Sequence, residues 1–520
     1  MPRSAAKESS ASFGVESSLA MELSIAFHTL GCKLNQLETE SLADAFRKSG
    51  ALVLGGGPDE AADLVIVNTC TVTGKAEQKA RHFVRQALAR NPEAVAIVTG
   101  CYAQVDPAAL ASLHERAVVV PGDEKAGLLD LAAFLAEEWQ GHGDLLDALI
   151  LWRRSVGPIP ADAKGMGAAP GRVEGPPGGE SVRVGRSLDS FAFRPEEFAF
   201  HSRPSLKIED GCDNHCSYCR VRIARGPARS LSAEEILARL RALEASGKAE
   251  AVLTGVNLFQ YRGAGGGPGG GAGGGFRLPA LLRLLLDGTR SIAIRLSSYE
   301  PEGIDEEFLE VLAHPRLRPH VHLPVQSGSD RVLRRMARAY RRDQVIAACA
   351  ALRRVKGDLF VAADLIAGFP GETDEDFADT LDLARSCDFA WIHAFPFSPR
   401  PGTAAWNMGP KVPERVAGER ARALGALAKA GRADYIRRQV GCEVDAILEG
   451  GRPVGEDGLG HATSANYLKL SIEDLPPGLP GGAAIGCRLA PPFDRKGLEK
   501  VGQADGCFDI KAVYISTISR

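Results

Sequence analysis

A run of nine residues, GCDNHCSYC at positions 211–219, constrains this chain more than any other feature of its sequence. It holds Cys212, Cys216 and Cys219, which are separated by three and by two residues. Three thiolates are too few for a structural zinc site, which takes four ligands. An iron–sulfur cube also normally takes four cysteine thiolates. The loop therefore predicts a four-iron cluster in which one iron lacks a protein ligand, with a zinc knuckle or three unrelated thiols as the alternatives.

A second set of cysteines follows three apolar segments nearer the N-terminus. Cys32, Cys70 and Cys101 close the segments LSIAFHTLGC, LVIVNTC and VAIVTGC. Polar stretches with helical patterning come next, at residues 36–49 and 75–90, and strands that alternate with helices predict a parallel sheet. Because the carboxyl ends of parallel strands meet at one edge of a sheet, we expect these three cysteines to lie together.

The patterning predicts an α/β protein of three domains. Residues 21–151 form the N-terminal parallel-sheet α/β domain. Residues 201–436 again alternate strands with helices, as in a partial βα barrel, whose chemistry lies at the carboxyl ends of the strands. Residues 437–520 contain short strands and Gly/Pro turns, which predict a small antiparallel β-barrel.

The segments outside these domains have biased compositions. Residues 1–20 are rich in Ser and Ala and are predicted to be a disordered extension, with Met21 as a candidate start of translation. Residues 152–200 are rich in Gly, Pro, Ala and Arg and are interpreted as a flexible linker. Residues 263–275 are almost entirely glycine, and ordering them would cost too much entropy, so they are expected to form a flexible surface loop.

Composition excludes several classes of protein. A net charge of −3 gives no overall attraction to nucleic acid, so any RNA contact must rely on local patches. The apolar run at residues 145–152 is far shorter than the roughly 20 residues that span a bilayer. Eleven cysteines without an export signal indicate thiols or metal ligands of a cytoplasmic protein, not disulfides.

Several motifs resemble those of one enzyme family. The loop at residues 211–219 resembles the signature of radical S-adenosylmethionine (SAM) enzymes, in which the open iron binds the methionine part of SAM. The motifs TLGCKLNQLETE, VIVNTCTVT and VTGCYAQ, and later HLPVQSGSDRVLRRM, DLIAGFPGETDEDF and FPFSPRPGT, are similar to those of the methylthiotransferases. The run GHATSANYLKLSI resembles a TRAM domain, a small RNA-binding barrel. The similarity covers nearly the whole chain after Met21.

This resemblance implies a cofactor set and a reaction. It implies two 4Fe–4S clusters, one on each set of three cysteines, and SAM, which is cleaved reductively to a radical that takes hydrogen from the substrate carbon. TLGCK is typical of the branch that inserts a methylthio group at C2 of N6-threonylcarbamoyladenosine beside the anticodon of tRNA. The implied partners are the tRNA anticodon stem-loop and an electron donor such as flavodoxin or ferredoxin.

Three alternatives to this function stay open at this point. Two are the same chemistry on another substrate, either isopentenyladenosine or an aspartate of a ribosomal protein. The third is a non-catalytic iron–sulfur protein that binds RNA or senses redox state.

The resemblance also indicates residues that contact SAM. They lie inside the cysteine loop or at later strand ends that face the predicted barrel mouth, with turn geometry as the alternative role of the serines and glycines. They are Tyr218, Thr254, Gly255, Asn257, Ser297, Ser298, Glu300 and Gln326, with Gly368–Gly371 shaping a turn near the adenine. Arg222 stands where the family usually has a proline before its Arg-Gly pair, and we expect it to affect the outer edge of the loop and no ligand.

Basic residues between positions 331 and 342 recur every three or four residues and predict a basic stripe on one helix face. A solvated surface is the usual meaning of such a stripe, whereas a tRNA substrate would use it to neutralise phosphates. The predicted RNA contacts are Arg331, Arg335, Arg338 and Arg342 in the stripe, and Tyr467, Lys469, Arg452 and Arg488 in the third domain.

Overall fold

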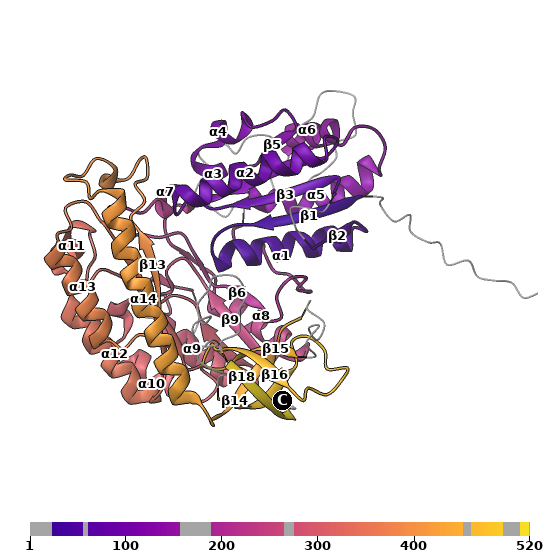
Figure 1. Ribbon diagram of the computed structural model, residues 1–520. Coiled ribbons are helices and arrows are strands. Elements are labelled where there is room, and N and C mark those ends of the chain that lie inside the picture. Colours follow the sequence, from indigo (N-terminus) through magenta and orange to yellow (C-terminus); the bar gives the residue numbers. More distant parts are fainter. Residues whose placement is uncertain are drawn as a thin grey trace, which may run out of the picture.

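The computed structural model describes residues 23–55, 61–156, 189–264, 275–450, 459–491 and 510–518. The N-terminal extension, Met21, Arg452, most of the glycine-rich loop and the middle of the predicted linker lie outside these ranges. Three bodies follow one another along the chain, as Figure 1 shows in indigo and purple, in magenta to orange, and in yellow. The α/β fold class is confirmed.

The first body is a five-stranded parallel sheet with the strand order β2-β1-β3-β4-β5. Its two central strands, β3 and β4, are buried along their whole length, because helices cover both faces. The strands are β1 (Ser24–Thr29), β2 (Leu52–Leu54), β3 (Leu64–Thr69), β4 (Val95–Gly100) and β5 (Ala117–Val119).

Apolar residues on both faces of this sheet join it to its helices. Phe46, Leu131 and Trp152 form a core on one face, and Phe83 and Leu110 belong to the core on the other. The helices are α1 (Lys33–Lys48), α2 (Gly74–Arg90), α3 (Cys101–Val105), α4 (Pro107–Ala111), α5 (Leu128–Phe134) and α6 (Leu145–Val156).

The second body is a partial barrel built from two three-stranded parallel sheets, β10-β9-β6 and β11-β12-β13. Parallel bridges from Ile294 to Leu317 and from Ser298 to His322 join the two sheets. The strands are β6 (Ser205–Lys207), β9 (Glu250–Thr254), β10 (Ala293–Leu296), β11 (His320–Gln326), β12 (Phe360–Ala367) and β13 (Trp391–Pro396), and a short pair, β7 (Glu209–Asp210) and β8 (Arg229–Ser230), lies beside them.

Helices surround this partial barrel on its outside. Val321 and Leu323 of β11 alternate with His320 and His322, and the two apolar side chains belong to the core that the helices share. His320 and His322 therefore point to the opposite, inner face of the barrel. The helices are α7 (Val221–Arg225), α8 (Ala233–Ala245), α9 (Leu278–Gly288), α10 (Glu306–Leu312), α11 (Asp330–Arg335), α12 (Arg342–Lys356), α13 (Asp374–Ser386) and α14 (Glu414–Gln439).

The third body is a closed five-stranded barrel with the order β14-β15-β16-β18-β17. One of its pairings, between β16 and β18, is parallel, so the barrel is not entirely antiparallel as predicted. Its strands are β14 (Glu443–Leu448), β15 (Gly460–Ser464), β16 (Lys469–Glu473), β17 (Ala484–Leu489) and β18 (Ile510–Thr517).

The predicted linker, residues 152–200, is too long at both ends. Trp152 belongs to α6 and is buried in the first core, and the helix continues to Val156. After residue 188, Phe193 is buried in the same core, and the backbone N–H groups of Ala199 and Phe200 donate to Glu40. Alternating Phe residues in an otherwise polar segment were the signal for this packing. Among the described residues, no helix is both long and apolar enough to cross a membrane.

Candidate functional site

The cysteines of the first body lie at the carboxyl edge of its sheet, as predicted. Cys70 directly follows β3, Cys101 begins α3 after β4, and Cys32 precedes α1 after β1. Gly31 and Gly100 allow this close approach. Gly100 has a φ of +96°, and a Cβ there would lie 2.4 Å from the carbonyl oxygen of Thr69.

An asparagine holds two of these cysteine loops together. The side-chain amide of Asn35 donates to the carbonyl oxygens of Leu30 (2.7 Å) and Thr69 (3.0 Å), which lie just before Gly31 and Cys70. Burial, with a smaller contribution from the nearby thiols of Cys101 and Cys32, raises the pKa of the Cys70 thiol to about 12. The three thiols are therefore neighbours in space.

The loop of the second body is closed by backbone hydrogen bonds. The N–H of Cys212 donates to Gly226 (3.1 Å), and the N–H of Cys219 donates to Cys216 (3.1 Å). Burial raises the pKa of Cys219 to about 12, with Cys216 and Cys212 adding to the shift. These thiols also form one group.

Arg222, which departs from the family pattern, braces the outer edge of this loop. Its guanidinium donates to the carbonyl oxygen of Asp213 (3.1 Å) and lies 3.1 Å from Nε2 of His215. It therefore ties the loop together in a way that a proline could not.

Residues next to the two cysteine groups are bonded to each other across the domain boundary. Arg220, which follows Cys219, donates to the hydroxyl of Thr71, which follows Cys70 (3.2 Å). Arg220 and Arg400 both pair with Glu77 of α2. The two groups of thiols therefore lie on facing sides of one interface.

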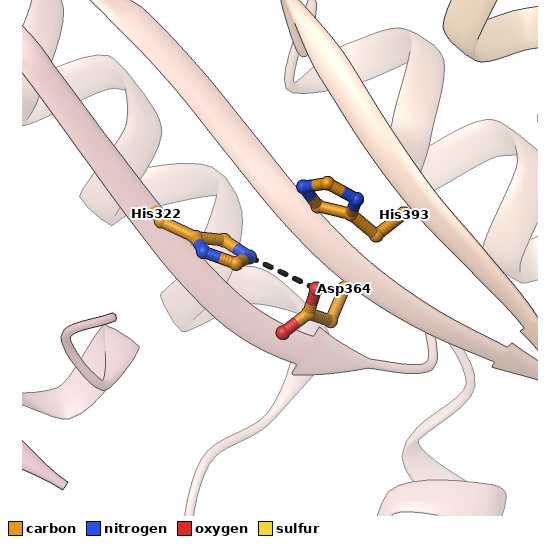
Figure 2. Close-up of side chains that lie close together, drawn as sticks. All are labelled: His322, Asp364 and His393. Carbon is orange, nitrogen blue, oxygen red and sulfur yellow. Dashed lines mark hydrogen bonds and ion pairs between the residues drawn. The ribbon is translucent and has the colours of Figure 1, made fainter. Parts of the chain in front are cut away.

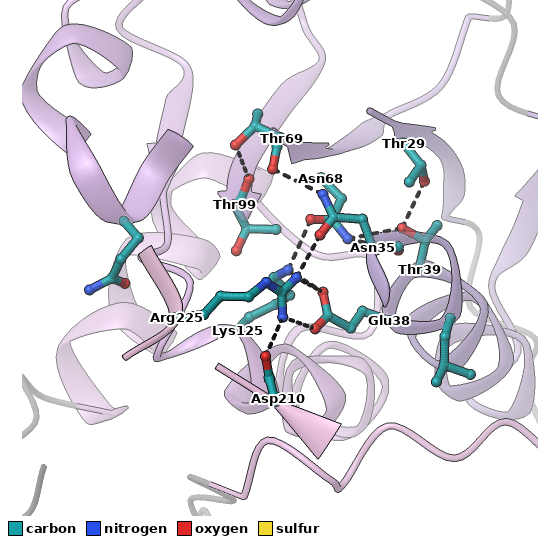
Figure 3. A network of polar contacts seen from close by, with 12 residues as sticks. Thr29, Asn35, Glu38, Thr39, Asn68, Thr69, Thr99, Lys125, Asp210 and Arg225 are labelled. Carbon is teal, nitrogen blue, oxygen red and sulfur yellow. Dashed lines mark hydrogen bonds and ion pairs between the residues drawn. The ribbon is translucent and has the colours of Figure 1, made fainter. Parts of the chain in front are cut away.

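A buried network fixes that interface more firmly (Figure 3). The carboxylate of Glu38 pairs with three cations: Lys125 at 2.5 Å, Lys207 at 3.1 Å and Arg225 at 3.0 Å. Burial opposes its charge, but these cations hold the pKa of Glu38 well below its usual range.

Arg225 connects this network to both cysteine groups. It follows the radical-type loop, and its guanidinium donates to Asp210 (3.0 Å) and to the side-chain oxygen of Asn35 (2.8 Å). Asn35 in turn holds the loops of Cys32 and Cys70. One arginine therefore sets the position of one loop relative to the other.

The predicted SAM contacts gather around the second loop. The amide of Asn257 lies 4.0 Å from the sulfur of Cys212, and its backbone N–H donates to Glu209 (2.8 Å). A Cβ on Gly255 would lie 2.6 Å from the Glu209 carboxylate, so glycine is required there. Thr254 ends β9 beside them.

Tyr218 lies in the same loop, Glu300 is joined to it through Arg338, and Gln326 ends strand β11. Tyr218 packs edge-on against Phe369, at 6.5 Å between ring centroids. Gln326 adopts a φ of +66° at the end of β11. Burial raises the pKa of Glu300 to about 7, although it pairs with Arg338.

The predicted basic stripe on one helix is wrong. α11 ends at Arg335 and α12 begins at Arg342, because Ala337 adopts a φ of +58° in the turn between them. Arg338 lies in that turn and is nearly buried, with its guanidinium 3.2 Å from the sulfur of Cys216 and paired with Glu300. It is therefore unsuited to RNA phosphate and instead supports the cysteine loop.

The other arginines of the stripe also have partners within the protein. Arg331 pairs with Asp376, Arg335 donates to the carbonyl oxygens of Pro370 (3.1 Å) and Gly409 (2.9 Å), and Arg342 pairs with Asp382. Arg335 thereby clamps the GFPG turn. RNA contacts of Arg331, Arg335 and Arg342 stay predictions.

The predicted RNA-binding residues of the third body lie in different settings. The ring of Tyr467 is half-buried against His320 (4.3 Å between centroids), with the ammonium of Lys33 5.7 Å from the ring centre. Lys33 lowers the pKa of Tyr467 to about 8. Lys469 pairs with Glu449 at 3.0 Å, and Arg488 pairs with Glu443 at 2.6 Å. All three bodies thus meet at Tyr467.

Sequence reasoning missed one group of residues on the inner face of the barrel. His322, Asp364 and His393 come from the neighbouring strands β11, β12 and β13, and their polar atoms all lie within 4.8 Å of one another (Figure 2). Polar and apolar residues alternate along β11, β12 and β13, and this alternation places the three side chains on one face of the sheet. Only the strand order shows that they are neighbours.

The two thiol groups fit metal clusters. Each has three thiols that are close enough to raise one another's pKa, and a thiolate so placed needs a cation to stabilise it. Arg338, whose guanidinium contacts the sulfur of Cys216, supplies a cation to one of these thiols. Six cysteines in two groups of three thus suit two clusters, each with an iron left open.

Comparison with known proteins agrees with this geometry. Residues 206–384 match the model of the Radical SAM superfamily, and residues 24–122 match that of the Uncharacterized protein family UPF0004. A protein of Treponema pallidum, named "Threonylcarbamoyladenosine tRNA methylthiotransferase MtaB", is 41% identical over 86% of this chain and 94% of its own length. The chain belongs to the radical SAM methylthiotransferase family. Methylthiotransferases of this family carry two 4Fe–4S clusters and use SAM.

Two further comparisons are with more distant proteins. A "tRNA-2-methylthio-N(6)-dimethylallyladenosine synthase" of Sorangium cellulosum is 35% identical over 81% of each chain. The solved structure of the radical SAM methyltransferase TsrM from Kitasatospora setae covers 74% of this chain and 77% of its own, with 17% identity and a TM-score of 0.47.

Proposed function

We propose that this chain is a tRNA methylthiotransferase that inserts a methylthio group at C2 of N6-threonylcarbamoyladenosine beside the anticodon. The observation that carries the proposal is the hydrogen bond across the domain boundary between Arg220 and Thr71, each of which directly follows a cysteine of one group. A reaction that needs both a radical and a sulfur donor at one carbon requires two such groups to face one substrate.

Each group of three cysteines holds one cluster in this proposal. Cys212, Cys216 and Cys219 would hold the cluster that binds SAM and would supply the radical chemistry. Asn257 lies beside Cys212, and Glu300 is joined to Cys216 through Arg338. Cys32, Cys70 and Cys101 would hold the cluster at which the sulfur for transfer is bound.

The protein's own residues fix the geometry between these sites. The ion pair of Glu38 with Arg225 fixes the position of one cysteine loop relative to the other. Because both residues are buried, water is excluded from this ion pair. We further propose that the barrel of the third body and the exposed arginines contact the anticodon stem-loop, and that a flavodoxin or ferredoxin in the cytoplasm supplies electrons.

The choice of substrate follows the relatives. The 41% identical relative is named for threonylcarbamoyladenosine, whereas the 35% identical relative is named for dimethylallyladenosine. Both names refer to tRNA, which disfavours a ribosomal-protein substrate and a non-catalytic role.

Nucleoside mass spectrometry tests the assignment. Transfer RNA from a deletion strain should lose methylthiolated threonylcarbamoyladenosine, and a plasmid with the intact gene should restore it. A Cys70→Ala plasmid is the matched control and should not restore it. Loss of methylthiolated isopentenyladenosine instead, or unchanged nucleosides, would reject the proposal.

A further inference from the structure

The group formed by His322, Asp364 and His393 interacts with residues that adjoin both cysteine sites. Glu300, which is joined through Arg338 to Cys216, interacts electrostatically with Asp364. From the other side, Lys33, which follows Cys32, interacts with His393. The three side chains therefore lie on the inner face of the barrel, between residues that adjoin the two cysteine groups.

Hydrogen bonds fix the orientation of the first two members (Figure 2). Nε2 of His322 lies 2.9 Å from Oδ1 of Asp364, and Nδ1 of His322 lies 3.3 Å from the hydroxyl of Ser298. A carboxylate only accepts, so Nε2 of His322 is the donor. Among the described residues, the second oxygen of Asp364 has no hydrogen-bond partner and remains an acceptor.

The third member offers a donor. The indole N–H of Trp391 lies 3.3 Å from Nδ1 of His393, and an indole nitrogen can only donate. Nδ1 is therefore an acceptor, and in the neutral ring the proton is on Nε2. Desolvation by the surrounding protein lowers the pKa of His393, which favours that neutral ring. His393 is also exposed, so a ligand can reach it.

This protonation pattern disfavours a metal ion at the group. A metal needs a free lone pair on each imidazole. With Nε2 protonated, the lone pair of each ring is on Nδ1, which accepts from Ser298 in His322 and from Trp391 in His393. What the group presents instead is one acceptor beside one donor. An N6-substituted adenine presents the complement, a single N6–H beside a ring nitrogen that accepts.

We propose that Asp364 and His393 bind the edge of the target adenine. Asp364 accepts from N6–H, His393 donates to the neighbouring ring nitrogen, and His322 and Ser298 orient Asp364. Reading a base that has left its stack through paired donors and acceptors is the general solution for enzymes that modify bases. This inference rests on the proposed function.

The test uses the cluster-loaded enzyme and a fluorescent anticodon stem-loop RNA that carries threonylcarbamoyladenosine. Asp364→Asn and His393→Ala should each weaken RNA binding about tenfold, the value of one well-formed hydrogen bond. In the Asp364→Asn variant, His322 would hold the oxygen of the introduced amide, which leaves its NH2 group facing N6–H. Exposed residues of α6 and of the preceding turn supply the matched controls, Asp147→Asn and His142→Ala, which should bind as the wild type does.

Modified RNAs separate this contact from a general loss of structure. Stem-loops with 1-deaza- or 7-deaza-adenine at the target position lack one ring nitrogen each. On one of them His393→Ala should cause no further loss, while Asp364→Asn still weakens binding about tenfold. Equal losses on all RNAs, or no loss in either variant, would overturn the inference.

Two controls complete the experiment. Zinc that the wild-type enzyme retains after dialysis against zinc chloride, and that His393→Ala removes, would overturn the inference in favour of a metal site. Wild-type enzyme that fails to methylthiolate the RNA would instead reject the proposed function. Wild-type activity with unaffected variants would reject this inference alone.

Discussion

The two cysteine groups are built in opposite ways. Cys212, Cys216 and Cys219 lie in one short loop, closed by its own backbone hydrogen bonds and by Arg222. The other group draws on three strand ends that are far apart in the sequence and meet only when the sheet forms.

This difference shows which residues determine the positions of the cysteines in each group. The local loop takes its cysteine spacing from its own short sequence, although Arg338 and the backbone before it also support the loop. The dispersed group depends on tight turns at Gly31 and Gly100 and on Asn35, whose orientation is fixed by Arg225 from the second body. The position of the dispersed cysteines therefore depends on a residue of the second body, Arg225.

The largest expected effect comes from removing one cysteine of each group. Cys216→Ala should abolish the release of 5′-deoxyadenosine from SAM, because the local loop can no longer hold its cluster. Cys70→Ala should leave that release measurable while methylthiolation is lost. Chromatography of both products checks this, and methylthiolation by Cys70→Ala would show that the dispersed group is misassigned.

Glu38→Gln should weaken the contact between the two groups. It removes the carboxylate that three buried cations share. Asp210 still pairs with Lys207 and Arg225, but Lys125 keeps no carboxylate partner among the described residues, so we expect a loss of about 3 kcal/mol of the free energy of unfolding. Anaerobic urea denaturation measures this loss. Glu419→Gln, which breaks an exposed pair with Arg415 on α14, is the control and should change stability by less than about 1 kcal/mol. Similar values for the two variants would contradict the role of Glu38.

Gly100→Ala should damage only the dispersed site. The new methyl group would meet the backbone of Thr69 at a positive φ, and we expect a loss of about 3 kcal/mol or more with lower iron content. Gly141→Ala is matched in φ, at +83°, but has nothing within 4 Å, so it should cost only about 1–2 kcal/mol. Full iron content in Gly100→Ala would show that the turn is not needed.

The smallest effect concerns the junction of the three bodies at Tyr467. Its pKa is lowered to about 8, chiefly by Lys33, whereas the unfolded value is near the ordinary 10. Because the folded pKa is the lower one, ionisation of Tyr467 adds stability as pH rises from 8 to 10. Ultraviolet difference absorbance should show one tyrosine ionising near pH 8, absent in Tyr467→Phe. If the variant still showed a tyrosine ionising near pH 8, the assignment of this ionisation to Tyr467 beside Lys33 would be wrong.

Much of the fold could be predicted because the patterns are local. The strands that precede Cys32, Cys70 and Cys101 are continuous apolar runs, and a parallel sheet brings their ends together whatever the details of packing. The ends of the predicted linker were misjudged, because the burial of Trp152 and Phe193 depends on a core that forms from distant elements.

The parts that could not be predicted depend on tertiary contacts. Arg338 has the spacing of a surface stripe, but one residue at positive φ, Ala337, turns it toward Cys216. His322, Asp364 and His393 become a group only through the order of β11, β12 and β13. Sequence spacing carries no information on either arrangement.

Iron and sulfide content after anaerobic purification tests the central claim most directly. The account predicts that the wild type holds two four-iron clusters and that a triple variant, Cys32→Ala, Cys70→Ala and Cys101→Ala, retains half of the iron and still cleaves SAM. Zinc in the wild type, or equal iron in the two proteins, would contradict it.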